Sequence, residues 1–126
     1  MKKLTFIACL LLLCIFSCEK NETPQEQDLA KLQELKSKII TLAENKTCEE
    51  SSHWNFTPIG NKACGGPKEY IAYSNKIEVS KFLKLVEKYT KAEKTYNIKW
   101  GIVSDCSVPK QPSAVVCTDG SPTFQY

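Results

Sequence analysis

Two segments of the chain repeat apolar residues at helical spacing, and the first has a clear beginning. Thr23 is followed by Pro24 and, three residues on, by Glu26, which is typical of a helix start with an N-cap, a first-turn proline and a capping-box glutamate. The apolar residues that follow recur every three or four positions: Leu29, Leu32, Leu35, Ile39 and Leu42. This pattern predicts an amphipathic helix of about 20 residues that ends near Asn45.

The second helical segment is rich in lysine. Ser80 is placed to cap it, and Gly101 stands just beyond its end, where glycine commonly closes a helix. The lysines, together with Glu87 and Glu93, are expected on the solvent face. The opposite face is apolar and aromatic, and we interpret it as core: Phe82, Leu85, Val86, Tyr89, Ala92, Tyr96 and Trp100.

The remaining segments are shorter and favour strands. The alternation in "HWNFTPIG", residues 53–60, predicts one strand, and "AVVCT" and "PTFQY" flank Asp119-Gly120-Ser121 in the manner of a hairpin. The stretch "GGPKEYIAYS", residues 65–74, fits either a short helix opened by Pro67 or a strand. The predicted fold class is α+β, with two main helices packed on a small antiparallel sheet or hairpin and stabilised by disulfides.

The N-terminus has a different pattern, because apolar residues there are continuous. Lys2 and Lys3 precede a run from Leu4 to Phe16 that is interrupted only by Thr5. A helix needs about 20 apolar residues to cross a bilayer, so this run is too short for a stable span and has the length of a signal-peptide core. It predicts an export signal.

The end of that run, Ile15-Phe16-Ser17-Cys18, resembles the lipobox of bacterial lipoproteins. In that family the cysteine is joined to diacylglycerol, the chain is cleaved before it, and the new amine is acylated. The resemblance implies a lipoprotein signal peptide at 1–17, a lipidated Cys18 with a short tether at 18–22, and one small domain at 23–126. It also implies a lipid anchor in the cell envelope, on the periplasmic face or the outer surface of the outer membrane.

Charge argues against nucleic acid as a partner. Loss of Lys2 and Lys3 leaves 15 of the 17 lysines against 14 acidic residues, and the chain contains no arginine. Binding to phosphate backbones requires a cationic patch that releases counterions, which a near-neutral chain does not predict. The sequence also matches neither a P-loop nor a dinucleotide fingerprint, so no cofactor is expected.

Four cysteines remain in the expected exported domain: Cys48, Cys64, Cys106 and Cys117. An even number in an exported small domain favours disulfides, whereas a structural zinc site would usually have close C-x₂₋₄-C pairs, which are absent here. We therefore expect no metal site. The preferred pairing is Cys64 with Cys106 and Cys48 with Cys117, because it ties the middle of the chain to the end of the long helix and the first helix to the hairpin. Pairing of sequence neighbours stays open.

Catalytic signals are weak. The single histidine, His53, lies near Glu49, Glu50, Ser51 and Ser52. A lone histidine without a nucleophile signature is more typical of a surface or strand-edge residue, so a small hydrolase using His53 with a nearby carboxylate is the alternative rather than the main hypothesis.

The most individual stretch is "PIGNKACGGPKEYIAYS", in which Gly65-Gly66-Pro67 follows an expected disulfide cysteine. Paired glycines permit positive φ and close approach of another chain, although a purely structural turn would also use them. This stretch together with Ser104-Asp105-Cys106 is similar to a group of small exported bacterial proteins without an assigned activity. The proposed binding loop comprises Gly65, Gly66, Pro67, Tyr70 and Tyr73.

The sequence thus predicts a membrane-anchored envelope lipoprotein whose domain acts as a non-catalytic binding or inhibitor-like module. The expected partners are the membrane, through the N-terminal lipid, and an envelope or extracellular protein or glycan. A purely structural envelope component is a further alternative.

Overall fold

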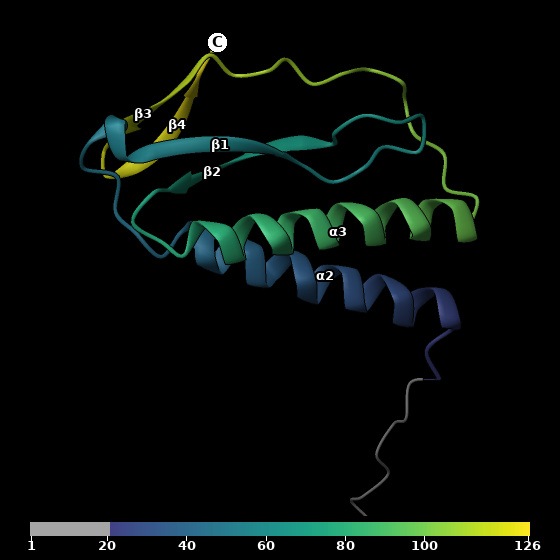
Figure 1. The fold of residues 1–126 in the computed structure, drawn as a ribbon. Coiled ribbons are helices and arrows are strands. Elements are labelled where there is room, and N and C mark those ends of the chain that lie inside the picture. The colour runs from purple at the N-terminus through teal and green to yellow at the C-terminus, as the bar shows by residue number, and fades with distance from the viewer. Residues whose placement is uncertain (1–20) are drawn as a thin grey trace, which may run out of the picture.

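The computed structural model describes residues 21–126, which form two long helices and two β-hairpins (Figure 1). This confirms the predicted α+β class. The expected signal peptide at 1–17, Cys18 and most of the tether at 18–22 lie outside the described residues. Among the described residues, no helix combines the length and the apolar character that crossing a membrane requires.

Helix α2 spans Pro24–Ala43 and begins as predicted. The Thr23 hydroxyl accepts a hydrogen bond from the backbone N–H of Glu26 at 3.3 Å, and the Glu26 carboxylate accepts one from the backbone N–H of Thr23 at 2.7 Å. These reciprocal bonds satisfy two donors that a helix start would otherwise leave unpaired. The helix ends at Ala43, two positions before the predicted Asn45.

Helix α3 spans Val79–Lys99 and corrects two predictions. Its N-cap is Glu78 rather than Ser80, because the backbone N–H of Phe82 already donates to the Glu78 carbonyl at 3.0 Å. Glu93 is 6 % exposed, so it does not lie on the solvent face. Gly101 has φ of +58° just beyond the C-cap, which is the conformation expected of a closing glycine.

The stretch that the sequence left ambiguous is a strand. β1, Trp54–Ile59, pairs antiparallel with β2, Glu69–Ser74, with Phe56 opposite Ala72. The second hairpin joins β3, Ala114–Thr118, to β4, Ser121–Gln125. Its two-residue turn has φ of +48° at Asp119 and +76° at Gly120, the signs that favoured hairpin turns require.

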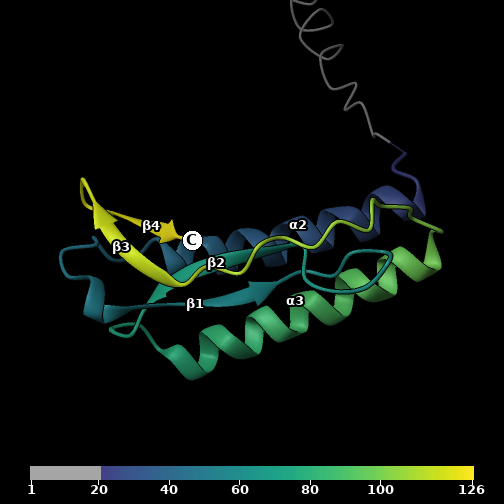
Figure 2. The same cartoon turned by 90° about the horizontal axis from the view of Figure 1, so that it is seen from above.

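The four strands of the two hairpins lie above a layer formed by the two helices (Figures 1 and 2). Seen from above, β1 and β2 lie over the space between α2 and α3 (Figure 2). The main core fills this junction and is built from Leu32, Ile39, Ala43, Ile59, Phe82, Val86 and Tyr89. A second cluster of Cys48, Trp54 and Val115 joins the two hairpins.

Both disulfides have the preferred pairing, so the pairing of sequence neighbours is wrong. Cys48 is bonded to Cys117 and Cys64 to Cys106, with Cα atoms 5.3 and 5.5 Å apart. The first disulfide belongs to the second cluster and ties the chain after α2 to β3. The second ties the loop after β1 to the segment after α3.

Candidate functional site

The loop between β1 and β2, residues 60–68, is the candidate site, and we call it the glycine loop. At its apex Gly65 and Gly66 have φ of +96° and +82°, and a Cβ added to either would meet nothing within 4 Å. Two backbone bonds close the turn, from Gly65 N–H to the Lys62 carbonyl at 2.9 Å and from Lys62 N–H to the Gly66 carbonyl at 3.0 Å. The glycines are therefore required for backbone conformation rather than for space.

A buried carboxylate fixes the start of this loop to α3. Glu93 Oε2 accepts the backbone N–H of Asn61 at 2.8 Å, while Oε1 accepts Lys68 Nζ at 2.9 Å and the Tyr89 hydroxyl at 3.1 Å. Burial, with the Glu93 carboxylate beside the ring hydroxyl, raises the pKa of Tyr89, so the hydroxyl stays protonated and donates. Gly60 packs so closely here that a Cβ would lie 2.6 Å from Glu93 Oε2.

Two further bonds join α3 to the same loop. Asn97 Nδ2 donates to the Asn61 carbonyl at 2.8 Å, and the Thr90 hydroxyl accepts the Gly60 N–H at 3.1 Å. The loop backbone is thus held by Thr90, Glu93 and Asn97, which follow one another about one helical turn apart on α3. Sequence reasoning missed Glu93, although its spacing of four from Tyr89 and seven from Val86 places it on the buried stripe.

The other side of the glycine loop is held by the segment that follows α3. Besides the Cys64–Cys106 disulfide, Lys62 Nζ forms an ion pair with Asp105 and donates to the Ser107 carbonyl at 2.7 Å. The Lys62 ammonium, followed by bonds from Ser107, lowers the pKa of Asp105 to about 2. Asp105 therefore stays ionised over the whole physiological range.

Exposed aliphatic side chains flank this clamped loop. Ile98 is 73 % exposed, Val103 is 90 % exposed and Val108 is 75 % exposed. An open hollow of about 530 Å³ lies between the loop apex and the end of α3, lined by Gly65, Gly66, Lys94, Asn97, Ile98 and Ile102 among others. We call this region, the glycine loop with Ile98, Val103 and Val108, the loop surface.

The structure brings only part of the predicted binding loop together. Gly65 and Gly66 share the apex, and Pro67 follows them at the entry to β2. Tyr73 instead packs its ring on Phe82 in the core, with centroids 4.9 Å apart. Tyr70 is the second residue of β2, near the glycine loop, and its ring lies edge-on to that of Phe56 with centroids 5.9 Å apart. Because side chains alternate along β2, Tyr70 and Tyr73 lie on opposite faces of the hairpin, and only Tyr73 is directed into the core.

His53 lies at the opposite end of β1 from the glycine loop. It ends a short 3₁₀ turn, Ser51–His53, where its Nδ1 is 3.6 Å from Glu50 Oε2. The Ser52 hydroxyl donates to Glu50 Oε1 at 2.6 Å, and this bond, followed by the charge of His53, lowers the pKa of Glu50. Among residues 21–126, no group of three or more His, Cys, Asp or Glu side chains is arranged to hold a metal ion.

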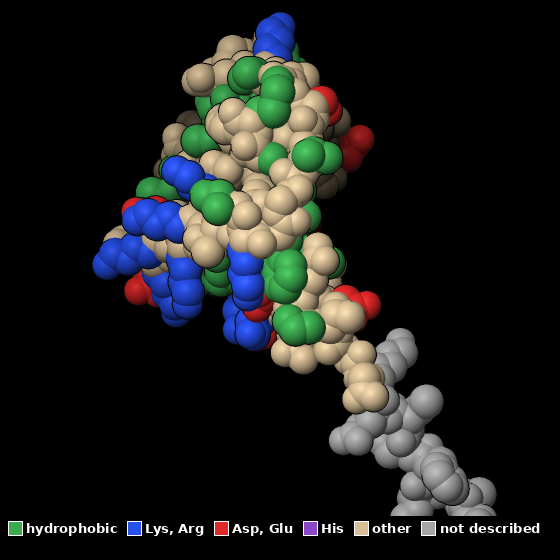
Figure 3. Space-filling model, turned by 90° about the vertical axis from the view of Figure 1, so that its right-hand side faces the viewer, with side chains coloured by type: hydrophobic (Ala, Val, Ile, Leu, Met, Phe, Trp, Pro, Cys, Tyr) green, Lys and Arg blue, Asp and Glu red, His purple; other side chains and the backbone are tan. Residues whose placement is uncertain are grey.

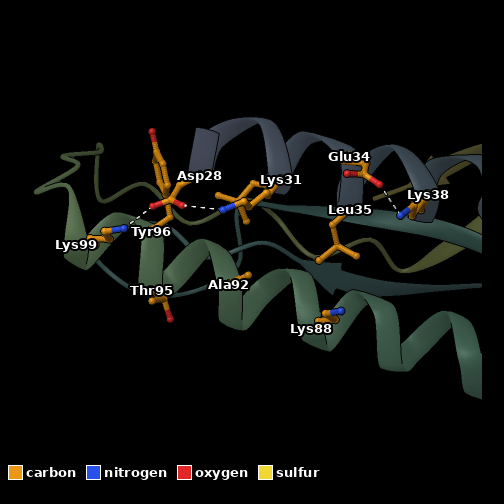
Figure 4. A pocket seen from close by; sticks show the side chains of 11 residues that line it. Asp28, Lys31, Glu34, Leu35, Lys38, Lys88, Ala92, Thr95, Tyr96 and Lys99 are labelled. Atoms are coloured by element: carbon orange, nitrogen blue, oxygen red, sulfur yellow. Dashed lines mark hydrogen bonds and ion pairs between the residues drawn. The ribbon is translucent and has the colours of Figure 1, made fainter. Parts of the chain in front are cut away.

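A second concave feature is a groove of about 560 Å³ between α2 and α3, on the face away from the strands (Figure 4). Leu32, Leu35, Ala92 and Tyr96 give it an apolar floor. Charged side chains from both helices line its rims: Asp28, Lys31, Glu34, Lys38, Lys88 and Lys99. Lys99 Nζ lies 2.6 Å from Asp28 Oδ2 and so closes one end of the groove.

Comparison with known proteins adds no family. No protein family model matches the sequence, and neither a curated protein nor a solved structure is significantly similar to it.

Proposed function

We propose that the chain is a lipoprotein of the bacterial cell envelope, anchored through Cys18, and that its domain is a non-catalytic binding module. The lipobox-like residues Ile15-Phe16-Ser17-Cys18 support the anchor. The two disulfides support the compartment, because disulfides persist outside the reducing cytosol. The domain acts at the membrane to which the lipid attaches it.

The loop surface is the proposed binding site, and the observation that carries it is a fixed loop beside exposed aliphatic side chains. The glycine loop is held by Glu93, by the Cys64–Cys106 disulfide and by the Lys62 contacts to Asp105 and Ser107. A loop already fixed in one conformation loses little entropy on binding. Exposed apolar side chains gathered around one loop are typical of an interaction site.

An envelope or extracellular protein is the favoured partner. Ile98, Val103 and Val108 are aliphatic, and such side chains are buried effectively in the apolar centre of a protein interface. A glycan is the alternative, through the backbone groups of the Gly65–Gly66 apex. The hydrolase alternative would use His53 with Glu50, which lie 3.6 Å apart on an exposed turn.

Photo-crosslinking in intact membranes tests the binding site. A photoreactive amino acid at Val103 is expected to give one adduct of defined mass. The Ile98→Asp substitution should abolish this adduct, since it places a charge in the apolar surface. The matched control Thr118→Asp, on an exposed strand end away from the loop surface, should leave it unchanged.

Replacement of both Gly65 and Gly66 by valine tests the loop itself. The positive φ angles at these positions disfavour β-branched residues, so the apex must change conformation while the sheets remain. An unchanged yield of the Val103 adduct would contradict the role of the glycine loop.

The anchor has a separate test. Cys18→Ala is expected to abolish labelling with a radioactive fatty acid and to release the protein from membranes. Persistent labelling of that variant would show that a different residue carries the lipid.

A further inference from the structure

The charges of the domain are divided between its two layers. Five lysines of α3 follow one another at intervals that place them on the same exposed side of the helix: Lys81, Lys84, Lys88, Lys91 and Lys99. This side lies opposite the buried stripe that contains Phe82 and Val86. The lysines therefore face away from the strands.

Helix α2 adds Lys31 and Lys38 from the other rim of the groove (Figure 4). Four carboxylates accompany these seven lysines on the outer side of the helix layer: Asp28, Glu34, Glu78 and Glu87. The rest of residues 21–126 contains seven lysines and nine acidic residues. Figure 3 shows the same division, with blue side chains gathered on the helix layer below the strands.

Local contacts do not neutralise the α3 lysines completely. Lys91 pairs with Glu87, Lys81 Nζ is 3.7 Å from Glu78 Oε2, and Lys99 pairs with Asp28. Within residues 21–126, Lys84 and Lys88 are exposed and belong to no ion pair. A surface with an excess of ammonium groups around an apolar groove is complementary to an anionic, amphipathic layer.

The entry of the chain also points to a lipid surface. The described chain begins at Asn21 and enters α2 through Thr23, so the helix layer is the first part of the fold after the N-terminal segment (Figure 1). From Cys18 to Thr23 a fully extended chain reaches only about 17 Å. An anchor at Cys18 therefore keeps the helix layer within reach of the bilayer.

We propose that the outer face of α2 and α3 docks on the anionic headgroups of the bilayer to which the chain is anchored. This inference rests on the proposed anchoring at Cys18. Lys84, Lys88 and Lys91 contact lipid phosphates, and the groove between the helices receives the apolar region beneath the headgroups. Docking in this orientation directs the strand layer away from the membrane.

Lysine footprinting on the full-length protein tests the proposal. The protein is reconstituted into vesicles of phosphatidylcholine alone or with about one third phosphatidylglycerol, an anionic lipid. Acetylation of each lysine is then followed by mass spectrometry. We expect acetylation of Lys84 and Lys88 to slow about tenfold on the anionic vesicles only, and the effect to vanish in about 0.5 M salt, where the Debye length is short. Lys110, exposed in the segment before β3, serves as the internal control.

Two triple variants distinguish docking by this face from nonspecific attraction between a cationic protein and anionic vesicles. Lys84→Gln with Lys88→Gln and Lys91→Gln should lower the ratio of docked to undocked protein about 100-fold, read from the acetylation of Lys31 and Lys38. The control variant, Lys46→Gln with Lys76→Gln and Lys110→Gln, removes the same charge from exposed positions outside the helices and should leave that ratio unchanged. Equal effects of the two variants would refute docking by this face.

Separate measurements test the proposed anchor and the proposed docking. Sedimentation with neutral vesicles measures the anchor alone, whereas the footprint measures docking. If the anchored protein shows no protection of Lys84 and Lys88 on anionic vesicles, the proposal is wrong. Protection in native membranes but not on protein-free anionic vesicles would assign the face to a protein partner and would also overturn it.

Discussion

Replacing Glu93 by glutamine tests whether the buried carboxylate holds the glycine loop. The carboxylate has two acceptor oxygens: Oε2 serves the Asn61 N–H, and Oε1 serves Tyr89 and Lys68. The amide of glutamine has only one oxygen, so its NH₂ group must face one set of these donors. In either orientation at least one buried donor loses its acceptor.

The expected cost follows from these contacts. An unsatisfied buried donor costs about 1–3 kcal/mol, and loss of the negative charge weakens the bonds that remain. We expect Glu93→Gln to lower the free energy of unfolding by about 3 kcal/mol, which corresponds to about 10–15 °C in melting temperature for a domain of this size. The matched control is Glu87→Gln on the exposed side of α3, whose solvent-exposed pair with Lys91 contributes little to stability.

Urea unfolding followed by circular dichroism measures both variants, and hydrogen exchange of the Asn61 amide reports the loop. A double-mutant cycle with Tyr89→Phe isolates the contact itself. Phenylalanine has no hydroxyl to satisfy, so the two substitutions together should cost about 1 kcal/mol less than their sum. Equal costs for Glu93→Gln and Glu87→Gln, or strict additivity in the cycle, would refute this account of the buried network.

Four further predictions concern the same domain. Replacing Cys64 and Cys106 by serine should lower the free energy of unfolding by about 4 kcal/mol, because the closed loop spans 42 residues; a urea titration that shows no change would contradict it. The carboxyl of Asp105 should titrate near pH 2 by NMR, and Lys62→Met should raise that pKa toward 3.8, since the lysine is the main cause of the shift. Because the folded pKa is lowered, the contribution of Asp105 to stability is complete above about pH 4 and is lost as the pH falls through about 2; stability that does not decline over this window would contradict it. His53→Ala should leave the Val103 adduct unchanged, as β1 separates the two sites by about 20 Å, and a lost adduct would argue for one continuous site.

Several elements could be predicted from interactions between residues that are close in the sequence. Thr23, Pro24 and Glu26 define the start of α2 because capping depends only on neighbours within one turn. Asp119 and Gly120 define the second hairpin for the same reason, since a two-residue turn needs residues that accept positive φ. The set of disulfide cysteines was also readable from their number and the expected export.

Other features depended on distant parts of the chain. Residues 69–74 carry no decisive local preference, and they form a strand because the edge of β1 is available to pair with them. The residues of the predicted binding loop were likewise separated by the fold. Gly65 and Gly66 lie at the loop apex, whereas strand alternation directs Tyr73 into the core against Phe82.

The sequence by itself determined the two amphipathic helices, the hairpin turn and the residue types available for crosslinks, because these depend on short-range spacing. Helical spacing places Glu93 on the buried stripe, but only the tertiary structure decided that a carboxylate is tolerated there, since donors from other elements must converge on it. It likewise decided that Lys31 and Lys38 of α2 lie on the same side of the molecule as the lysines of α3, because that arrangement follows from how the two helices pack beneath the strands.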